Sequence, residues 1–160
     1  MRRPKASDAD AIVDVVGHWE VARCLARVPH PYGPDDAGFF LDHVVPAEWV
    51  WAMTLHDSLT LIGAVGLTPH ANADTAELGY WLSPAYWGQG LMTEAAEAVV
   101  AFGFERLGLS ALTSGYFEDN PASGRVLRKL GFDETGRAMR SCLAAGETVP
   151  SIEMTLPRAR

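Results

Sequence analysis

Two glycines separated by one residue mark a turn where the chain could hold a phosphate group. Gly88 and Gly90 flank Gln89, after a strand-like run and before a helix-like run. Glycine has no Cβ, so the backbone of such a turn can approach a ligand closely. The first N–H groups of the following helix lack partners within it and carry the positive end of its dipole. The turn alone is weak evidence, because it lacks the full dinucleotide fingerprint and the Walker lysine.

Three polar side chains are candidates for chemistry, and each also has an ordinary structural explanation. Glu77 falls in a strand-like run, where its carboxylate either faces a cleft as a base or points into solvent. Asn120 stands before Pro121, which is typical of a helix start with a side-chain cap. Ser123 follows three residues later, either at a site or exposed in the first helical turn. The residues themselves leave these alternatives open.

Hydrophobic periodicity indicates which elements position these residues. Two helices come first, over about residues 7–27 and 35–46, separated by a proline-rich turn. Three strand-like runs with short polar links follow, at residues 49–55, 60–67 and 75–82, and predict an antiparallel meander. The remaining order is a helix beyond Gly90 to about Leu107, a strand at 109–117, a helix at 120–131, and two strands at 138–144 and 150–156. This order predicts an α/β (α+β) fold with helices packed on a mixed sheet, in which residues 1–4 form only a stub of a first strand.

Length and charge limit the class of protein. The chain has 160 residues, 48% of them hydrophobic, which predicts one globular domain over residues 1–160. The net charge of −7 argues against a nucleic-acid coat. Residues 120–140 are an exception and predict a basic patch for a small polyphosphate ligand, formed by Arg125, Arg128, Lys129, Arg137 and Arg140.

The cysteines, the apolar runs and the histidines bear on the cellular compartment, on membrane association and on metal binding. Cys24 and Cys142 show no metal or redox spacing, which predicts a reducing compartment and a cytoplasmic protein. No uninterrupted apolar run approaches the ~20 residues of a membrane span, so we expect no membrane partner. The five histidines form no H-x-x-x-H pair, so we expect no metal.

Three motifs resemble one family. Residues 86–95 read Y-W-G-Q-G-L-M-T-E-A and resemble the acetyl-CoA-binding motif of the GNAT superfamily of N-acetyltransferases, in particular its RimJ/RimL branch. Residues 120–123, N-P-A-S, followed by L-G-F at 130–132, resemble the N-x-x-S helix and the L-G-F end of that branch. Residues 28–32, V-P-H-P-Y, resemble its proline-rich link. The likeness spans nearly the whole chain apart from the short first strand.

The resemblance implies a fold and a co-substrate. The fold is a GNAT-like, mixed, mostly antiparallel sheet that splays after the strand carrying Glu77, with helices on both faces and a truncated first strand. Acetyl-CoA is the implied co-substrate and enters the gap. The residues expected to bind it are Trp81, Leu82, Gly88, Gln89, Gly90, Leu91, Met92, Thr93, Asn120 and Ser123.

The resemblance also implies catalytic roles. The acceptor amine attacks acetyl-CoA directly in a ternary complex, and Glu77 removes its proton through water. Many relatives carry a tyrosine acid at the position of Leu127, so we expect Ser123 to assist the leaving thiolate, with Tyr116 as a minor alternative. Tyr32 and Tyr80 are expected to bind the acceptor.

The sequence leaves alternatives open for the acceptor and for the activity itself. A protein N-terminal α-amine is the leading acceptor, and a small-molecule amine, such as a drug, polyamine or amino-acid derivative, is nearly as well supported. A catalytically silent acyl-CoA-binding module is the rival, because of Leu127, of Met92 in the turn and of the short first strand. A homodimer would cover the sheet edge that a missing first strand exposes.

Overall fold

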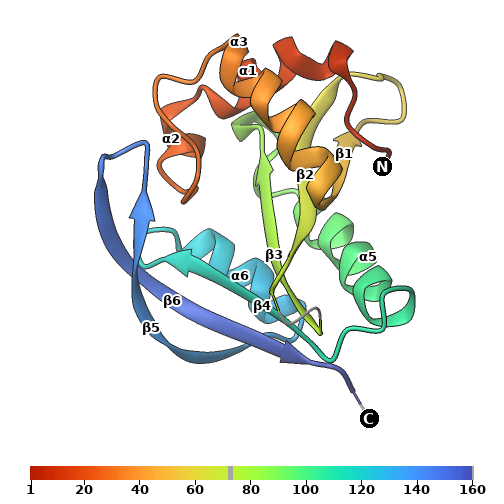
Figure 1. Cartoon of the computed structure of the whole chain (residues 1–160), viewed down its shortest axis with the longest axis vertical. Coiled ribbons are helices and arrows are strands. Elements are labelled where there is room, and N and C mark those ends of the chain that lie inside the picture. Colours follow the sequence, from red (N-terminus) through yellow and green to blue (C-terminus); the bar gives the residue numbers. More distant parts are fainter. Residues whose placement is uncertain (72–73, 160) are drawn as a thin grey trace.

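A six-stranded sheet forms the centre of the computed structural model, which describes residues 1–71 and 74–159 (Figure 1). Its strands are β1 (Trp49–Thr54), β2 (Leu61–Pro69), β3 (Thr75–Leu82), β4 (Ala111–Phe117), β5 (Asp133–Cys142) and β6 (Glu147–Pro157), in the spatial order β1-β2-β3-β4-β6-β5. The α-helices are α1 (Ala9–Val16), α2 (Trp19–Ala22), α3 (Pro34–Phe39), α4 (Val45–Ala47), α5 (Leu91–Glu105) and α6 (Pro121–Lys129). Shorter helical turns are η1 (Ala6–Asp8), the π-helix η2 (Phe40–Val44) and η3 (Pro84–Tyr86). This order confirms the predicted mixed α/β fold.

The sheet divides between β3 and β4. All other neighbouring strands are antiparallel, whereas β3 and β4 run parallel and pair only from Thr75 to Glu77. Just beyond the last pair, the buried Ser114 hydroxyl donates a 2.8 Å hydrogen bond to the carbonyl of Leu78. The two strands then separate, so the predicted splay after the strand carrying Glu77 is confirmed (Figure 1).

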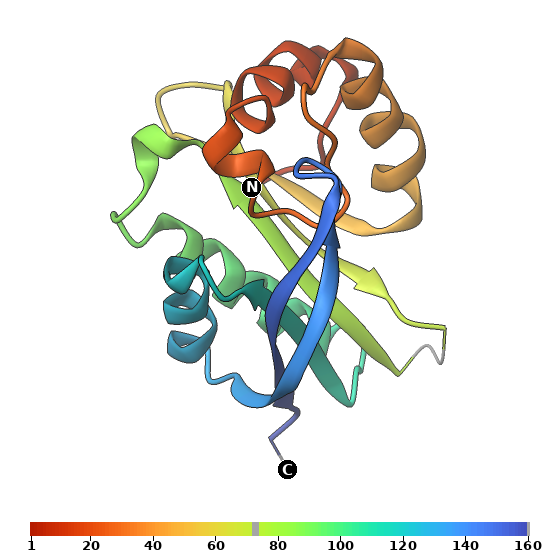
Figure 2. The same ribbon diagram turned by 90° about the vertical axis from the view of Figure 1, so that its left-hand side faces the viewer.

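Helices cover both faces of the sheet. Apolar side chains of α5 and α6 pack with Leu67, Leu78 and Leu112 in the main core on one face. The N-terminal helices pack on the other face, where Ile12 meets Ala52 and Leu61. Figure 2 shows α5 and α6 on the opposite side of the sheet from α1 and α3.

The β5–β6 hairpin extends across to the N-terminal helices. The backbone N–H of Leu143, at the turn of the hairpin, donates to the carbonyl of Ala26 at 3.3 Å, and the Cys142 thiol donates to the carbonyl of Arg23 at 3.5 Å. The turn therefore lies beside the segment that follows α2 (Figure 2). The hairpin and the N-terminal helices thus flank the face of β3 and β4 that α5 and α6 leave uncovered.

Some sequence-based boundaries differ from the structure, whereas the expected stub of a first strand is present. The first helix is not continuous over residues 7–27, because His18 is extended and separates α1 from α2. Strand β5 begins at Asp133 rather than at residue 138, since its exposed side chains give no alternating apolar pattern. The stub at the N-terminus consists of a single bridge, in which the backbone of Arg2 pairs with that of Ala52.

Candidate active site

The turn between β3 and α5 requires both of its glycines for their backbone conformation. Gly88 has φ 73° and Gly90 has φ 80°, in the left-handed region that side-chain-bearing residues rarely adopt. A Cβ built on either residue meets no atom within 4 Å. The constraint at both positions is therefore the dihedral angle rather than the available space.

This turn presents a row of unpaired backbone donors. None of the N–H groups from Gly88 to Thr93 donates a hydrogen bond within the described chain, and the first bond of α5 runs from Glu94 N–H to the carbonyl of Gly90. The Met92 side chain is buried in the main core, so it does not cover the outer side of the turn. The Trp87 indole donates to the carbonyl of Leu82 at 2.8 Å and fixes the turn to the end of β3. Such a donor cluster at a helix N-terminus suits phosphate oxygens.

The gap between the strands exposes peptide groups of β3. The carbonyl of Leu78 faces β4, because it accepts from Ser114, whereas the N–H of Ser83 faces β2, because it donates to Ile62. Backbone groups of an extended strand alternate between its two edges, so the N–H and C=O of Tyr80 point into the gap. An extended ligand with amide groups could pair with them.

Two predicted site residues meet on the α6 side of this gap. The Tyr80 hydroxyl lies 2.9 Å from the Ser123 hydroxyl and donates to the carbonyl of Ser123 at 3.2 Å. Burial raises the pKa of Tyr80 to about 12, and the bond to Ser123 opposes that shift only in part. Asn120 caps α6, since its Oδ1 accepts from the Ser123 N–H at 3.4 Å. Tyr80 therefore lies beside the predicted acid rather than next to Glu77.

Neither alternative position for a tyrosine acid, Leu127 or Tyr116, offers a free hydroxyl group. Leu127 is fully buried in the main core and carries no group that could donate a proton. The Tyr116 hydroxyl accepts a 2.7 Å hydrogen bond from Arg128, whose guanidinium also lies over the ring. Ser123, with Tyr80 beside it, is the hydroxyl that the fold leaves at the gap.

Glu77 is held by an arginine from the far edge of the sheet. Arg140 of β5 donates from Nη1 to Glu77 at 2.5 Å and from Nε and Nη2 to Glu153 of β6 at 2.8 and 2.5 Å. Gly115 leaves room for the guanidinium, because a Cβ there would lie 3.2 Å from it, a tight contact. The hydrogen bonds from Arg140 hold the pKa of Glu153 below its usual value and, in turn, raise the pKa of Arg140.

Polar residues continue across the same face. Glu48, just before β1, accepts from Arg27 at 2.9 Å and from the Thr68 hydroxyl at 2.8 Å. Thr68 is the register partner of Glu77 on β2. His70 bonds to Thr113, the register partner of Glu77 on β4, at 2.8 Å. The uncovered face of β3 and β4 is thus a polar, largely ion-paired surface.

Other predicted residues lie apart from this surface. Trp81 packs with Phe40 of the N-terminal helices, with ring centroids 6.3 Å apart. Tyr32 packs against the cluster around Ile12, and burial raises its pKa to about 12. The predicted basic patch does not form as one surface, because Arg140 binds Glu77 and Arg137 binds Glu118. Arg140 is instead ion-paired with Glu77 and Glu153.

Sequence reasoning did not single out Arg140 with Glu153, or His70 with Thr113, as members of the site. The signal was present only in β6, where alternation places Ile152 and Met154 in the core and therefore Glu153 on the opposite face. Arg140 could not be assigned to Glu77 without the strand order.

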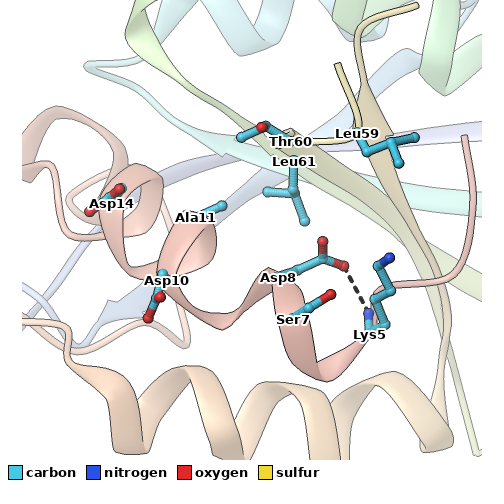
Figure 3. Close-up of a pocket in the computed structure, with 9 residues that line it drawn as sticks. All are labelled: Lys5, Ser7, Asp8, Asp10, Ala11, Asp14, Leu59, Thr60 and Leu61. Carbon is cyan, nitrogen blue, oxygen red and sulfur yellow. Dashed lines mark hydrogen bonds between the residues drawn. The ribbon is translucent and has the colours of Figure 1, made fainter.

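A separate hollow lies beside η1 and α1 (Figure 3). Asp8 faces it but is bound by Arg2 and by the N–H of Lys5, as the dashed line to Lys5 shows in part. Asp10 and Asp14 line the same hollow. These residues are distinct from the centre around Glu77.

Two general findings concern membranes and metals. No helix among residues 1–71 and 74–159 is long and apolar enough to cross a bilayer. Within those ranges, no three His, Cys, Asp or Glu side chains come together where they could hold a metal ion.

The chain is an α/β protein with a splayed sheet and a glycine turn after the central strand β3. The sequence model of the acetyltransferase (GNAT) domain matches residues 1–133, and the chain belongs to this family. An uncharacterized N-acetyltransferase of Bacillus subtilis, YoaA, is 40% identical over 89 residues, which are 54% of this chain and 49% of that protein. The spermidine N(1)-acetyltransferase of Escherichia coli is 33% identical over 81 residues, 51% of this chain and 44% of that protein. The chain thus aligns with about half the length of these curated relatives.

Solved structures share the fold. An acetyltransferase of the GNAT family from Bacillus anthracis superposes with a TM-score of 0.85 at 20% identity, covering 98% of this chain and 92% of that one. The ribosomal-protein-S5-alanine acetyltransferase of Vibrio fischeri gives 0.82 at 22% identity, covering 98% and 91%. At these identities the likeness establishes the fold alone.

Proposed function

We propose that residues 1–160 form one acetyl-CoA-dependent N-acetyltransferase domain of the RimJ/RimL-like branch, which acetylates a primary amine. One observation carries the proposal: the unpaired N–H groups from Gly88 to Thr93 adjoin a gap in the sheet that begins at Glu77. A phosphate-bearing acyl donor can therefore be anchored at the turn while its acyl end lies in the gap. The two unpaired cysteines, Cys24 and Cys142, support a cytoplasmic location.

Two groups of residues bind the acyl donor, acetyl-CoA. The turn residues Gly88, Gln89, Gly90, Leu91, Met92 and Thr93 bind the pyrophosphate of acetyl-CoA through backbone N–H groups. The peptide groups of Tyr80 and the N–H of Leu82, which point into the gap, bind the pantetheine arm, and Asn120 and Ser123 border it from α6. Trp81, the third residue expected from the sequence on this strand, has its peptide groups toward β2 and its ring against Phe40, so it supports the strand rather than contacting the donor.

Glu77 serves as the base. Its Oε1 accepts from Arg140, whereas its Oε2 accepts no hydrogen bond from the described chain. Oε2 is therefore available to take the amine proton through a water molecule, and the amine attacks the acetyl carbonyl directly. Ser123 donates a hydrogen bond to the departing thiolate, and Tyr80 orients Ser123.

The proposed acceptor is a protein N-terminal α-amine, with a small-molecule amine as the second candidate. Likeness to the putative ribosomal N-acetyltransferase YdaF of Bacillus subtilis, 33% identical over 63 residues, supports the first, and likeness to the spermidine acetyltransferase supports the second. An α-amine with a pKa of about 7.7–8.0 is roughly a tenth neutral at pH ~7, so a water-relayed carboxylate suffices. A lysine amine near ~10.4 is well under a thousandth neutral and would need a stronger base.

The test is release of CoA thiol from acetyl-CoA across peptides with varied N-termini, polyamines, aminoglycosides and amino acids. Calorimetric binding of acetyl-CoA is measured alongside. Glu77→Gln is expected to lower kcat at neutral pH by about 100-fold while acetyl-CoA affinity stays the same. Glu97→Gln, on the exposed side of α5, is the matched control. Binding of acetyl-CoA without turnover of any amine would instead support a silent acyl-CoA-binding module.

A further inference from the structure

Three glutamates share the face where the acceptor would bind. Glu77 is directly opposite Thr68 on β2 and Thr113 on β4, so the three side chains lie on one face. Glu153 is opposite Gly115, two residues along β4 from Thr113, and therefore lies on the same face. Glu48 joins this face through its 2.8 Å hydrogen bond from Thr68.

Almost every carboxylate oxygen on this face is already occupied. Both oxygens of Glu153 accept from Arg140, at 2.8 and 2.5 Å. Both oxygens of Glu48 are also bound, one by Arg27 at 2.9 Å and the other by Thr68. Glu77 Oε1 accepts from Arg140 at 2.5 Å. Among these three side chains, only Glu77 Oε2 accepts no hydrogen bond from the part of the chain that the structure describes.

The charges on this face balance to a single negative charge. Glu48, Glu77 and Glu153 are opposed by the guanidinium groups of Arg27 and Arg140. Two further carboxylates beyond the end of β4, Glu118 and Asp119, are paired with Arg137 and Arg23. A bound polyamine needs a partner for each ammonium that leaves water, because an unpaired charge is costly to desolvate.

We infer that the acceptor carries one ammonium group, as the α-amine of a peptide or an amino-acid derivative does, and that Arg140 excludes polyamines by occupying Glu77 and Glu153. This inference rests on the proposed function and narrows its substrate class. Polyamines are rejected because the guanidinium of Arg140 already occupies the carboxylates where a second ammonium group would bind. Arg140 thus acts as a specificity determinant and as a positioning residue for Glu77.

The test compares spermidine with a peptide that has a free α-amine and no lysine or arginine. The wild-type protein is expected to show at least about tenfold higher kcat/KM for the peptide. Arg140→Gln frees both carboxylates and is expected to lower KM for spermidine about tenfold or more, while kcat for the peptide falls because Glu77 loses its anchor. A gain of spermidine use cannot arise from a merely structural loss.

Two variants serve as controls. Arg140→Lys keeps the positive charge and is expected to keep rejecting spermidine. Arg137→Gln lies on the same strand but pairs with Glu118, so it is expected to leave both substrates unchanged. Circular dichroism and thermal unfolding establish that each variant is folded, and calorimetric titration of spermidine gives a binding readout independent of turnover.

The outcomes separate the inference from the proposed function. Equal kcat/KM for spermidine and the peptide in the wild type, or no gain of spermidine binding in Arg140→Gln, overturns the inference and leaves the proposed acetyl transfer standing. Absence of acetyl-CoA binding and of turnover overturns the proposed function, and the inference fails with it.

Discussion

The hydroxyl oxygens of Tyr80 and Ser123 lie 2.9 Å apart and join β3 to the first turn of α6 beside the gap in the sheet. The two residues come from separate motifs and meet because the sheet splays before Tyr80. Burial raises the pKa of Tyr80 to about 12, so its phenol stays protonated at neutral pH. A protonated phenol in this position can keep the Ser123 hydroxyl oriented toward a leaving group.

Replacing Tyr80 with Phe removes that orientation and little else. We expect Tyr80→Phe to lower kcat several-fold, to leave the KM for acetyl-CoA nearly unchanged, and to lower the free energy of unfolding by about 1 kcal/mol. Steady-state kinetics and urea unfolding measure these effects. Tyr116→Phe is the matched control, since it removes a hydroxyl bound to Arg128 rather than to Ser123. A larger loss of kcat in the control would assign the acid role to Tyr116.

At Gly90 the cost of the backbone conformation can be measured without a steric clash. A Cβ at Gly90 meets no atom within 4 Å, yet its φ of 80° is unfavourable for alanine. Gly90→Ala is expected to lower the free energy of unfolding by about 1 kcal/mol and to weaken acetyl-CoA binding several-fold, as the N–H groups of the turn shift. Urea unfolding and calorimetry check both.

Gly38→Ala is the control for Gly90→Ala, because it is expected to change the free energy of unfolding in the opposite direction. Gly38 lies within α3, has open space around a built Cβ, and has an ordinary φ. Alanine is favoured over glycine in a helix by about 0.5–1 kcal/mol, so this variant should be more stable. Equal effects at the two glycines would mean that the positive φ at Gly90 has no energetic role.

Elements and the turn could be predicted from the sequence because their signals are local. Alternation over residues 75–82 and helical spacing after Gly90 each arise within a few residues, and the structure has β3 and α5 at those places. The Asn120 cap was equally local, since Asn before Pro favours a helix start. Leu127, at the position where many relatives carry a tyrosine, is a buried core residue.

Contacts between distant strands could not be predicted in this way. Arg140 and Glu77 are 63 positions apart in the sequence. Their strands, β5 and β3, are separated in the sheet by β6 and β4, so the contact could be predicted only from the strand order β3-β4-β6-β5. The basic residues of 120–140 looked like one patch because sequence proximity was the only information available. The fold turns Arg128 toward Tyr116 and Arg140 toward Glu77.

Packing of α6 against β4 depends on a glycine. A Cβ on Gly124 would lie 2.5 Å from Cζ of Tyr116, too close for any real contact. Gly124→Ala is therefore expected to lower the free energy of unfolding by about 1–3 kcal/mol and to lower kcat/KM, because the adjacent Ser123 shifts with the helix. Thermal and urea unfolding measure the first effect, and CoA-thiol release measures the second.

A second substitution separates this clash from a general intolerance of α6. Tyr116→Leu removes the ring, so the double variant with Gly124→Ala should lose less stability than the two single losses added together. Gly136→Ala on β5, where a Cβ meets no atom and φ is not positive, should change stability by less than about 0.5 kcal/mol. Strict additivity in the double variant would show that the ring of Tyr116 is not the obstacle.

The N-terminal stub is anchored by a pair whose strength depends on pH. Asp8 is only 4% exposed and accepts from Arg2 at 2.7 and 2.8 Å and from the Lys5 N–H at 2.8 Å. The hydrogen bond from Arg2 is the main cause that lowers the pKa of Asp8 below its ordinary value of 3.8. Because the folded pKa lies below the unfolded one, the pair stabilises the fold above about pH 4, and this contribution is lost as the pH falls through the folded pKa.

Asp8→Asn should therefore lower the free energy of unfolding by about 2 kcal/mol at pH 7, with a smaller difference from the wild type below about pH 4. Urea unfolding at several pH values measures this difference. Asp10→Asn is the control, because Asp10 is exposed on the same segment and makes no ion pair with residues 1–71 or 74–159. A constant difference between Asp8→Asn and the wild type at every pH would indicate that packing, rather than the charge on Asp8, holds the stub.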